Sequence, residues 1–211
     1  KTQVNESIPM LNPKAGISYF LSPASTLYFS FAHATKEPNR SDYKSYYEAL
    51  QDDPNAKKPI AEKLNDIELG WRLTTPKVRL NLNGYYMAYQ DQLVLSGKLN
   101  STGYPIRENV GKSYRAGVEA DAMVQLSERW FWSPNLAFSK NLNRDYKSQD
   151  ADVATRTSSW GDTRISYAPD VVLGNTITFM PIDGFQIGLI SKYVGAQYVD
   201  NTERDEAKLD A

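Results

Sequence analysis

The 211-residue sequence contains no cysteine and a single histidine. The absence of cysteine excludes disulfides, zinc–thiolate sites, iron–sulfur clusters and cysteine nucleophiles. One histidine is too few for a histidine-rich metal site, and it leaves most histidine-dependent catalytic triads without the partners that they need. We therefore expect no catalytic residues, no metal site and no resident cofactor.

Long apolar runs and an excess of charge are also missing. No stretch approaches the run of about 18 apolar residues that a transmembrane helix needs. Helical membrane proteins are therefore excluded. Lysine and arginine together number 24, and aspartate and glutamate number 25, for a net charge of -1. Without a positive excess, nucleic acid is not an expected partner.

Aromatic residues are abundant in this polar chain. The 14 tyrosines, 7 phenylalanines and 4 tryptophans make up 12% of the sequence, while the mean hydropathy is -0.55. Aromatic and β-branched residues favour strands. Apolar and polar residues then alternate with period two along several segments, which predicts half-exposed strands. About eight strands are expected, in segments 14–21, 26–31, 66–73, 77–88, 114–126, 130–140, 171–180 and 185–194.

The links between these segments alternate in length. Links 22–25, 74–77, 127–129 and 181–184 are tight, whereas links 36–61, 97–104 and 141–162 are long or polar. Outer-membrane barrels place short turns on the periplasmic side and long loops outside. The charges of the third to fifth segments also lie on one strand face, as a polar barrel lumen requires. We therefore expect Leu69, Leu82, Val118 and Leu189 to face lipid. Glu68, Arg79 and Glu119 are expected to face the lumen.

Four segments carry a more specific pattern, in a fixed order along most of the chain. They are 12–16 (NPKAG), 59–71 (PIAEKLNDIELGW), 109–119 (NVG, then GVE) and 193–202 (YVGAQYVDNT). Together these segments resemble the barrel of TonB-dependent outer-membrane receptors, the plugged transporters of Gram-negative bacteria. The resemblance does not extend to the family's N-terminal plug or to its final strand, which has a terminal aromatic residue.

This resemblance implies an all-β fold: an antiparallel up-and-down meander of about eight strands that is part of a large transmembrane β-barrel. A barrel of this class has about 22 strands, so residues 1–211 would be a single segment, a fragment, of its later part. The expected function is uptake of a scarce nutrient across the cell outer membrane, without enzymatic activity. The ligand would be an iron–siderophore, haem, a cobalamin or an oligosaccharide. The other partners would be outer-membrane lipid, and TonB acting through the plug.

The longest link, 36–61, holds the candidate ligand-binding residues Arg40, Tyr43, Tyr46 and Tyr47. Aromatic faces beside cations suit sugars and anionic metal chelates, which bind by stacking and by charge-assisted hydrogen bonds. The alternative is that these tyrosines pack within their own loop, because most loop residues have no binding role.

Two pairs of acids lie two residues apart on one strand face, Asp66 with Glu68 and Glu119 with Asp121. We interpret them as polar lumen groups rather than as the acid pair of a hydrolase. Their expected basic partners are Arg72, Arg79 and Arg115. Two other fold classes remain open at this point. One is a soluble β-sandwich that binds carbohydrate, and the other is an eight-stranded outer-membrane barrel that closes on itself.

Overall fold

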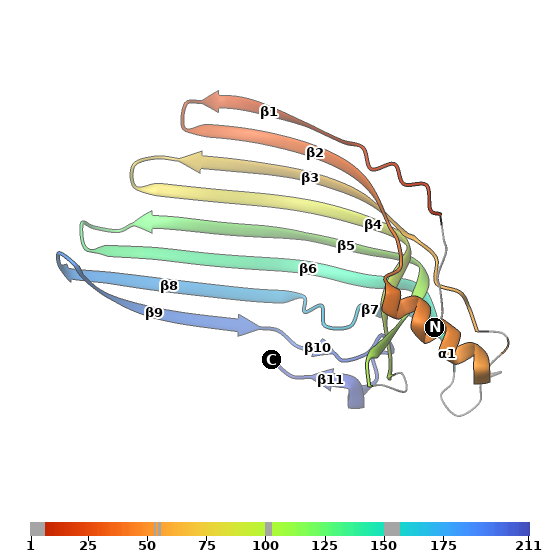
Figure 1. Cartoon of the computed structure of the whole chain (residues 1–211). Coiled ribbons are helices and arrows are strands. Elements are labelled where there is room, and N and C mark those ends of the chain that lie inside the picture. Colours follow the sequence, from red (N-terminus) through yellow and green to blue (C-terminus); the bar gives the residue numbers. More distant parts are fainter. Residues whose placement is uncertain (1–6, 53, 55, 100–102, 150–156) are drawn as a thin grey trace.

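The computed structural model of the chain describes residues 7–52, 54, 56–99, 103–149 and 157–211. Its main feature is an antiparallel meander of eight long strands in the order β1-β2-β3-β4-β5-β6-β8-β9 (Figure 1). Each long strand pairs with the next one along the chain, apart from the insertion of β7. The strands are β1 (Lys14–Ser22), β2 (Ser25–Lys36), β3 (Glu62–Thr74), β4 (Val78–Leu99), β5 (Pro105–Gln125), β6 (Trp130–Gln149), β8 (Val171–Ile182) and β9 (Phe185–Val194).

Smaller elements lie where the long connections join the strands (Figure 1). They are the helix α1 (Arg40–Asp52), the strand β7 (Thr157–Arg164), which pairs with β6, the two-stranded β10 (Gln197–Tyr198) and β11 (Lys208–Leu209), and a 3-10 turn at Asp205–Ala207. No helix in the described ranges is long and apolar enough to cross a bilayer.

The predicted all-β meander is confirmed, and each of the eight expected segments forms one of the eight long strands. The tight links form short turns at one edge of the sheet, which we call the turn edge (Figure 1). The opposite edge, which we call the loop edge, carries α1 and the long connections. The strands predicted from the sequence were too short at the loop edge, because β4, β5 and β6 reach 22, 21 and 20 residues. A membrane crossing needs only about 9–11 residues, so half of each of these strands is additional.

The two faces of the sheet differ in chemistry, as predicted. Leu69, Leu82 and Leu189 lie on one face, where they are 61%, 40% and 64% exposed. We call this the apolar face. Glu68 directly precedes Leu69 in β3, and successive side chains of a strand point to opposite faces. Glu68 and its partner Tyr85 therefore lie on the other face, and so does the pair of Glu119 with Asn83. We call this the polar face. The apolar face has no protein layer over it among the described residues, which is the arrangement of a lipid-facing wall.

The first and last strands of the sheet, β1 and β9, each have one side without a partner strand among the described residues. Within the described ranges, β1 pairs only with β2, and β9 pairs only with β8. The described strands therefore do not form a self-closed eight-stranded barrel. They do not form a β-sandwich either, because a sandwich packs two large sheets face to face, and the second sheet here has only β10 and β11.

Candidate functional site

The predicted ligand-binding loop contains the helix α1, which the sequence reading did not anticipate. Asn39 begins the helix: its side-chain Oδ1 accepts from the Asp42 backbone N–H at 3.0 Å, and the Asp42 carboxylate accepts from the Asn39 N–H at 2.8 Å. This reciprocal cap satisfies N–H groups that the first helical turn leaves free. A signal was present in the sequence, because residues 43, 46, 47 and 50 are all apolar or aromatic at helical spacing.

The helix separates the four candidate residues. Tyr43 is buried, at 6% exposure, so its ring packs against the protein. Tyr46 and Tyr47 are half-buried, with ring centroids 5.2 Å apart, and Arg40 is exposed. The structure thus leaves Arg40, Tyr46 and Tyr47 with surface that a ligand can contact, whereas Tyr43 supports the helix.

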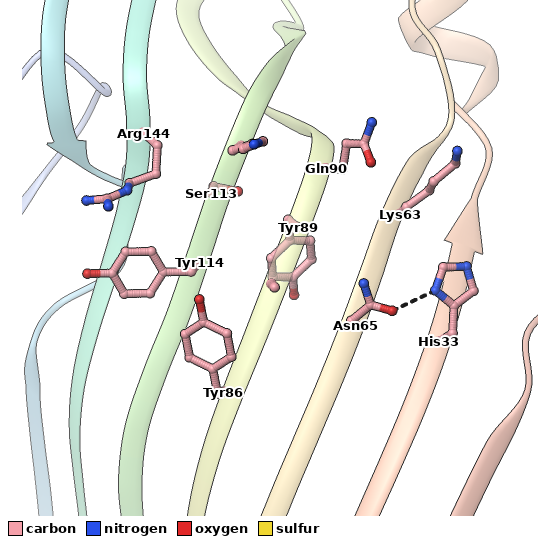
Figure 2. Close-up of a pocket in the computed structure, with 11 residues that line it drawn as sticks. His33, Lys63, Asn65, Tyr86, Tyr89, Gln90, Ser113, Tyr114 and Arg144 are labelled. Carbon is pink, nitrogen blue, oxygen red and sulfur yellow. Dashed lines mark hydrogen bonds between the residues drawn. The ribbon is translucent and has the colours of Figure 1, made fainter.

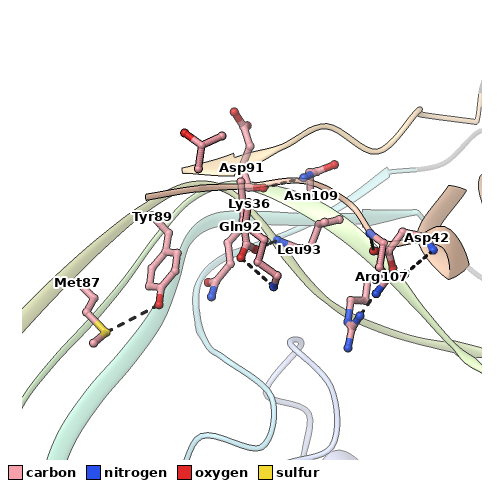
Figure 3. A network of polar contacts seen from close by, with 12 residues as sticks. Lys36, Asp42, Met87, Tyr89, Asp91, Gln92, Leu93, Arg107 and Asn109 are labelled. Carbon is pink, nitrogen blue, oxygen red and sulfur yellow. Dashed lines mark hydrogen bonds and ion pairs between the residues drawn. The ribbon is translucent and has the colours of Figure 1, made fainter. Parts of the chain in front are cut away.

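Charged contacts hold α1 and its flanking segment at the loop edge (Figure 3). The buried Asp42 carboxylate lies 3.8 Å from the Arg107 guanidinium on β5. At the other side, Glu62 accepts from the Lys36 ammonium at 3.1 Å and from the Leu93 backbone N–H at 3.0 Å. Because the carboxylates of Asp42 and Glu62 are largely buried, each ion pair is screened less than a surface pair.

Asn109 joins the segment after α1 to the long β4–β5 hairpin. Its amide exchanges two hydrogen bonds of 2.9 Å with the backbone of Ile60, and it also donates to the Asp91 carbonyl at 2.6 Å. One side chain therefore satisfies backbone groups from two separate segments. Asn109 begins the Asn-Val-Gly part of the family-like pattern, and the sequence alone assigned it no role.

The outer parts of β4, β5 and β6 share a small core, made of Val94, Val110 and Tyr146. The Tyr146 hydroxyl donates to the Glu108 carboxylate at 2.6 Å. Burial is the main cause that raises the pKa of Tyr146 above its ordinary value, and the negative charge of Glu108 raises it further. The phenol therefore stays protonated and keeps its hydrogen bond through the physiological range.

The segment after β9 closes over this region. Asn201 is fully buried; its Oδ1 accepts from the Ser166 backbone N–H at 2.9 Å and from the Asn143 side chain at 3.2 Å, and its amide donates to the Leu95 carbonyl. Arg164 adds ion pairs to Asp170 at 3.2 Å and to Glu203 at 3.3 Å. The loop edge is thus a connected platform that can present side chains to a ligand in fixed positions.

The acid pairs on the polar face do not match their predicted partners. Glu68 accepts from the Ser30 hydroxyl at 3.4 Å, and Asp121 accepts from the Asn81 amide at 2.9 Å. Among the described residues no arginine reaches ion-pair distance of these acids, so the prediction of arginine partners was wrong. Arg72 instead lies over the Tyr28 ring, 4.5 Å from its centroid. No group of three or more metal-ligating side chains occurs in the described ranges.

The architecture therefore combines an exposed apolar face, a polar face and a platform of long connections at the loop edge. A sequence profile described as the TonB-dependent receptor-like β-barrel matches residues 4–211. The chain belongs to the TonB-dependent receptor family. Members of this family are receptors and transporters of the Gram-negative outer membrane. No curated protein matches this chain at the sequence level.

Solved structures show the same fold. The copper transporter OprC is 21% identical, with a TM-score of 0.66 over 89% of this chain and 26% of that chain. The ferric yersiniabactin uptake receptor FyuA from Yersinia pestis is 19% identical, with a TM-score of 0.64 over 94% of this chain and 27% of that chain. The ferric enterobactin receptor PfeA from Pseudomonas aeruginosa, as its R480A mutant with enterobactin, is 18% identical, with a TM-score of 0.64 over 94% and 31%. This chain thus spans about a quarter to a third of these receptors.

Proposed function

We propose that this chain is one arc of the barrel of a TonB-dependent receptor that takes up a scarce nutrient through the outer membrane of a Gram-negative bacterium. The family match over residues 4–211 carries the proposal. The open edges of β1 and β9 support it, because unpaired backbone groups are not tolerated in lipid and neighbouring strands must complete the barrel. Energy would reach the receptor through TonB acting on a plug in the rest of the protein.

The transported ligand is an anionic metal chelate in this proposal. Arg40, at the start of α1, offers an exposed cation about two helical turns before the half-buried rings of Tyr46 and Tyr47. A guanidinium and aromatic faces on one helix suit a large, flat, negatively charged chelate, which can stack and accept charge-assisted hydrogen bonds together. FyuA and PfeA, which share the fold, are named for ferric chelates. Haem, a cobalamin and an oligosaccharide are the competing ligands.

Uptake assays on the full receptor test this function. Cells that lack the gene would be complemented with it and given radiolabelled ferric enterobactin, ferric yersiniabactin, haem, cobalamin and a maltooligosaccharide, with and without TonB. We expect energy-dependent uptake of one ferric chelate, which is lost without TonB. Uptake of none of these ligands, or uptake that does not need TonB, would reject the proposal.

The contribution of α1 is tested by the variant Arg40→Gln/Tyr46→Ala/Tyr47→Ala. We expect weaker ligand binding by the correctly inserted receptor, because all three side chains have exposed surface and none belongs to a strand. Tyr43→Phe is the matched control, since it keeps the buried ring. Unchanged affinity of the triple variant would assign these side chains to packing.

A further inference from the structure

A row of basic side chains crosses the apolar face near the loop edge. Lys63 on β3 pairs with Gln90 on β4, Gln90 pairs with Lys112 on β5, and Lys112 pairs with Arg144 on β6. All four side chains are exposed on the same side of the sheet. We call Lys63, Lys112 and Arg144 the basic row. Its position is unexpected, because this side of the sheet is otherwise mostly apolar. One further exposed cation, Lys140 on β6, lies on this face below the row, opposite an alanine of β5.

The height of the basic row matches the outer limit of a bilayer. On β4 the residues of the apolar face run from Val78 at the turn edge through Leu80 and Leu82 to Ala88, and Gln90 follows next. At about 3.3 Å per residue the stretch from Val78 to Ala88 measures about 33 Å along the strand. A strand tilt of about 45° reduces it to about 23 Å, close to the ~25 Å apolar band of outer-membrane barrels. The basic row therefore lies where hydrocarbon gives way to lipid head groups.

Aromatic side chains lie directly below the basic row, on the hydrocarbon side. Tyr86 and Tyr114 stack with ring centroids 5.9 Å apart, and the guanidinium of Arg144 lies 5.7 Å from the Tyr114 centroid. Tyrosine is enriched at the level of the head groups in membrane proteins. Along β5, an apolar stretch is followed by Tyr114 and then by Lys112. This order matches a lipid molecule from its acyl chains to its head group.

The charges of the basic row are not balanced within the described residues. Lys112 and Arg144 are directly opposite each other, and like charges in that position destabilise a sheet. Asp162 forms an ion pair with Arg144. Neither Lys63 nor Lys112 has a carboxylate within ion-pair distance among the residues that the structure describes, and the nearby Asp145 pairs with Lys147. Two cations are thus left for an anion from outside the chain.

These side chains also surround a hollow in the surface (Figure 2). His33, Lys63, Tyr86, Lys112, Tyr114 and Arg144 are among the residues that line it. The His33 ring is held by a 2.9 Å hydrogen bond to Asn65. The hollow is thus lined by both cations and tyrosine rings. Lys63 and Lys112 lie on strands two apart, about 10 Å between backbones, so both long side chains can turn toward one anionic group.

We propose that this hollow binds the phosphate of a lipid in the outer leaflet, with Lys63 and Lys112 contacting the phosphate and the acyl chains lying along the apolar face. The inference rests on the proposed function, since it requires the barrel to stand in the outer membrane. A lipid phosphate fits better than free phosphate, because the hollow continues into the exposed apolar face below it. Each basic residue near an anionic surface strengthens binding, and the phosphate offers charge-assisted hydrogen bonds.

Native mass spectrometry of the full receptor tests this site. The receptor would be held in dodecyl maltoside micelles that contain dioleoyl phosphatidic acid or dioleoyl phosphatidylcholine, and bound lipid would be counted. We expect phosphatidic acid to be retained at least about tenfold more tightly than phosphatidylcholine. The variant Lys63→Gln/Lys112→Gln should lose that preference, and Lys63→Arg/Lys112→Arg should keep it.

Lys77→Gln/Lys192→Gln is the matched control, because it removes the same charge from exposed lysines outside the basic row. We expect it to retain lipid like the wild type. Heat-modifiable electrophoretic mobility verifies that each variant forms a barrel. Equal loss in both double variants, no preference between the two lipids, or full displacement of the lipid by 10 mM inorganic phosphate would each overturn the inference.

The outcome is separable from the nutrient-uptake test. A receptor that retains phosphatidic acid through the basic row but takes up no nutrient contradicts only the proposed function. A receptor that takes up a ferric chelate but shows no lipid preference contradicts only the lipid site.

Discussion

The turn-edge half and the loop-edge half of the sheet are stabilised in different ways. Toward the turn edge, side chains alternate between the two faces, and large residues such as Leu69 and Leu82 remain exposed. Toward the loop edge, Val94, Val110 and Tyr146 form a core, and Asn143 and Asn201 are fully buried. The first half depends on a lipid solvent outside the chain, while the second half carries its own polar network and small core. The predictions below test this difference in the full receptor.

The largest expected effect is a charge on the apolar face. Leu82→Arg should reduce the free energy of unfolding in lipid bilayers by about 2–4 kcal/mol, because a cation at mid-membrane faces hydrocarbon. The neighbouring variant Asn83→Arg points to the polar face, where it should cost about 1 kcal/mol, for the lost hydrogen bond from Tyr28. Urea titrations of both variants measure the difference. Equal losses would contradict the assignment of the two faces.

The next effect concerns the buried amide of the loop edge. Asn201→Ala should weaken the local stability of the segments around Ser166 and Leu95 by about 2–3 kcal/mol, because it leaves buried backbone groups without partners. Hydrogen–deuterium exchange should show faster exchange there, with the turn edge unchanged. Asn81→Ala is the control, since it removes one exposed hydrogen bond to Asp121. Faster exchange over the whole sheet would contradict separate stabilisation of the two halves.

Tyr146→Phe should destabilise the packing of β6 on the outer β4–β5 hairpin by about 1–2 kcal/mol, because the Glu108 carboxylate loses its phenol donor. The raised pKa of Tyr146 also sets a pH dependence. Its stabilising contribution is complete below the ordinary tyrosine pKa of 10.0 and decreases as the pH rises above that value. Thermal melts from pH 8 to 11, with absorbance at 295 nm, measure both effects. A wild type and a Tyr146→Phe variant with the same pH dependence would refute this prediction.

The smallest expected effect tests close packing on the polar face. A Cβ atom at Gly70 would lie 2.2 Å from the Tyr28 ring. Gly70→Ala should displace the ring from Arg72 and Asn83 and cost about 1 kcal/mol. Gly188→Ala meets nothing within 4 Å and is the control. Urea titration in bilayers compares the two, and an equal cost would mean that the ring moves freely.

The sequence by itself determined the meander and its two faces. Period-two alternation places every other side chain on the same side, so the strands from 77–88 and 114–126 could be recognised without knowing their neighbours. The tight links identified the turn edge in the same way, because a two- to five-residue turn is a local property. The alternation of loop lengths and the family-like segments pointed to the barrel.

Only the tertiary structure decided the loop edge. The helix α1 was missed because its loop-like composition concealed the spacing of Tyr43, Tyr46 and Tyr47, and the burial of Tyr43 follows from packing. Asn109 and Asn201 acquire their roles from partners 49 and 106 residues away. Likewise, Lys63 and Lys112 lie in one row only because of the register of β3, β4 and β5. Contacts between distant segments depend on register and on loop closure, which no local pattern of residues encodes.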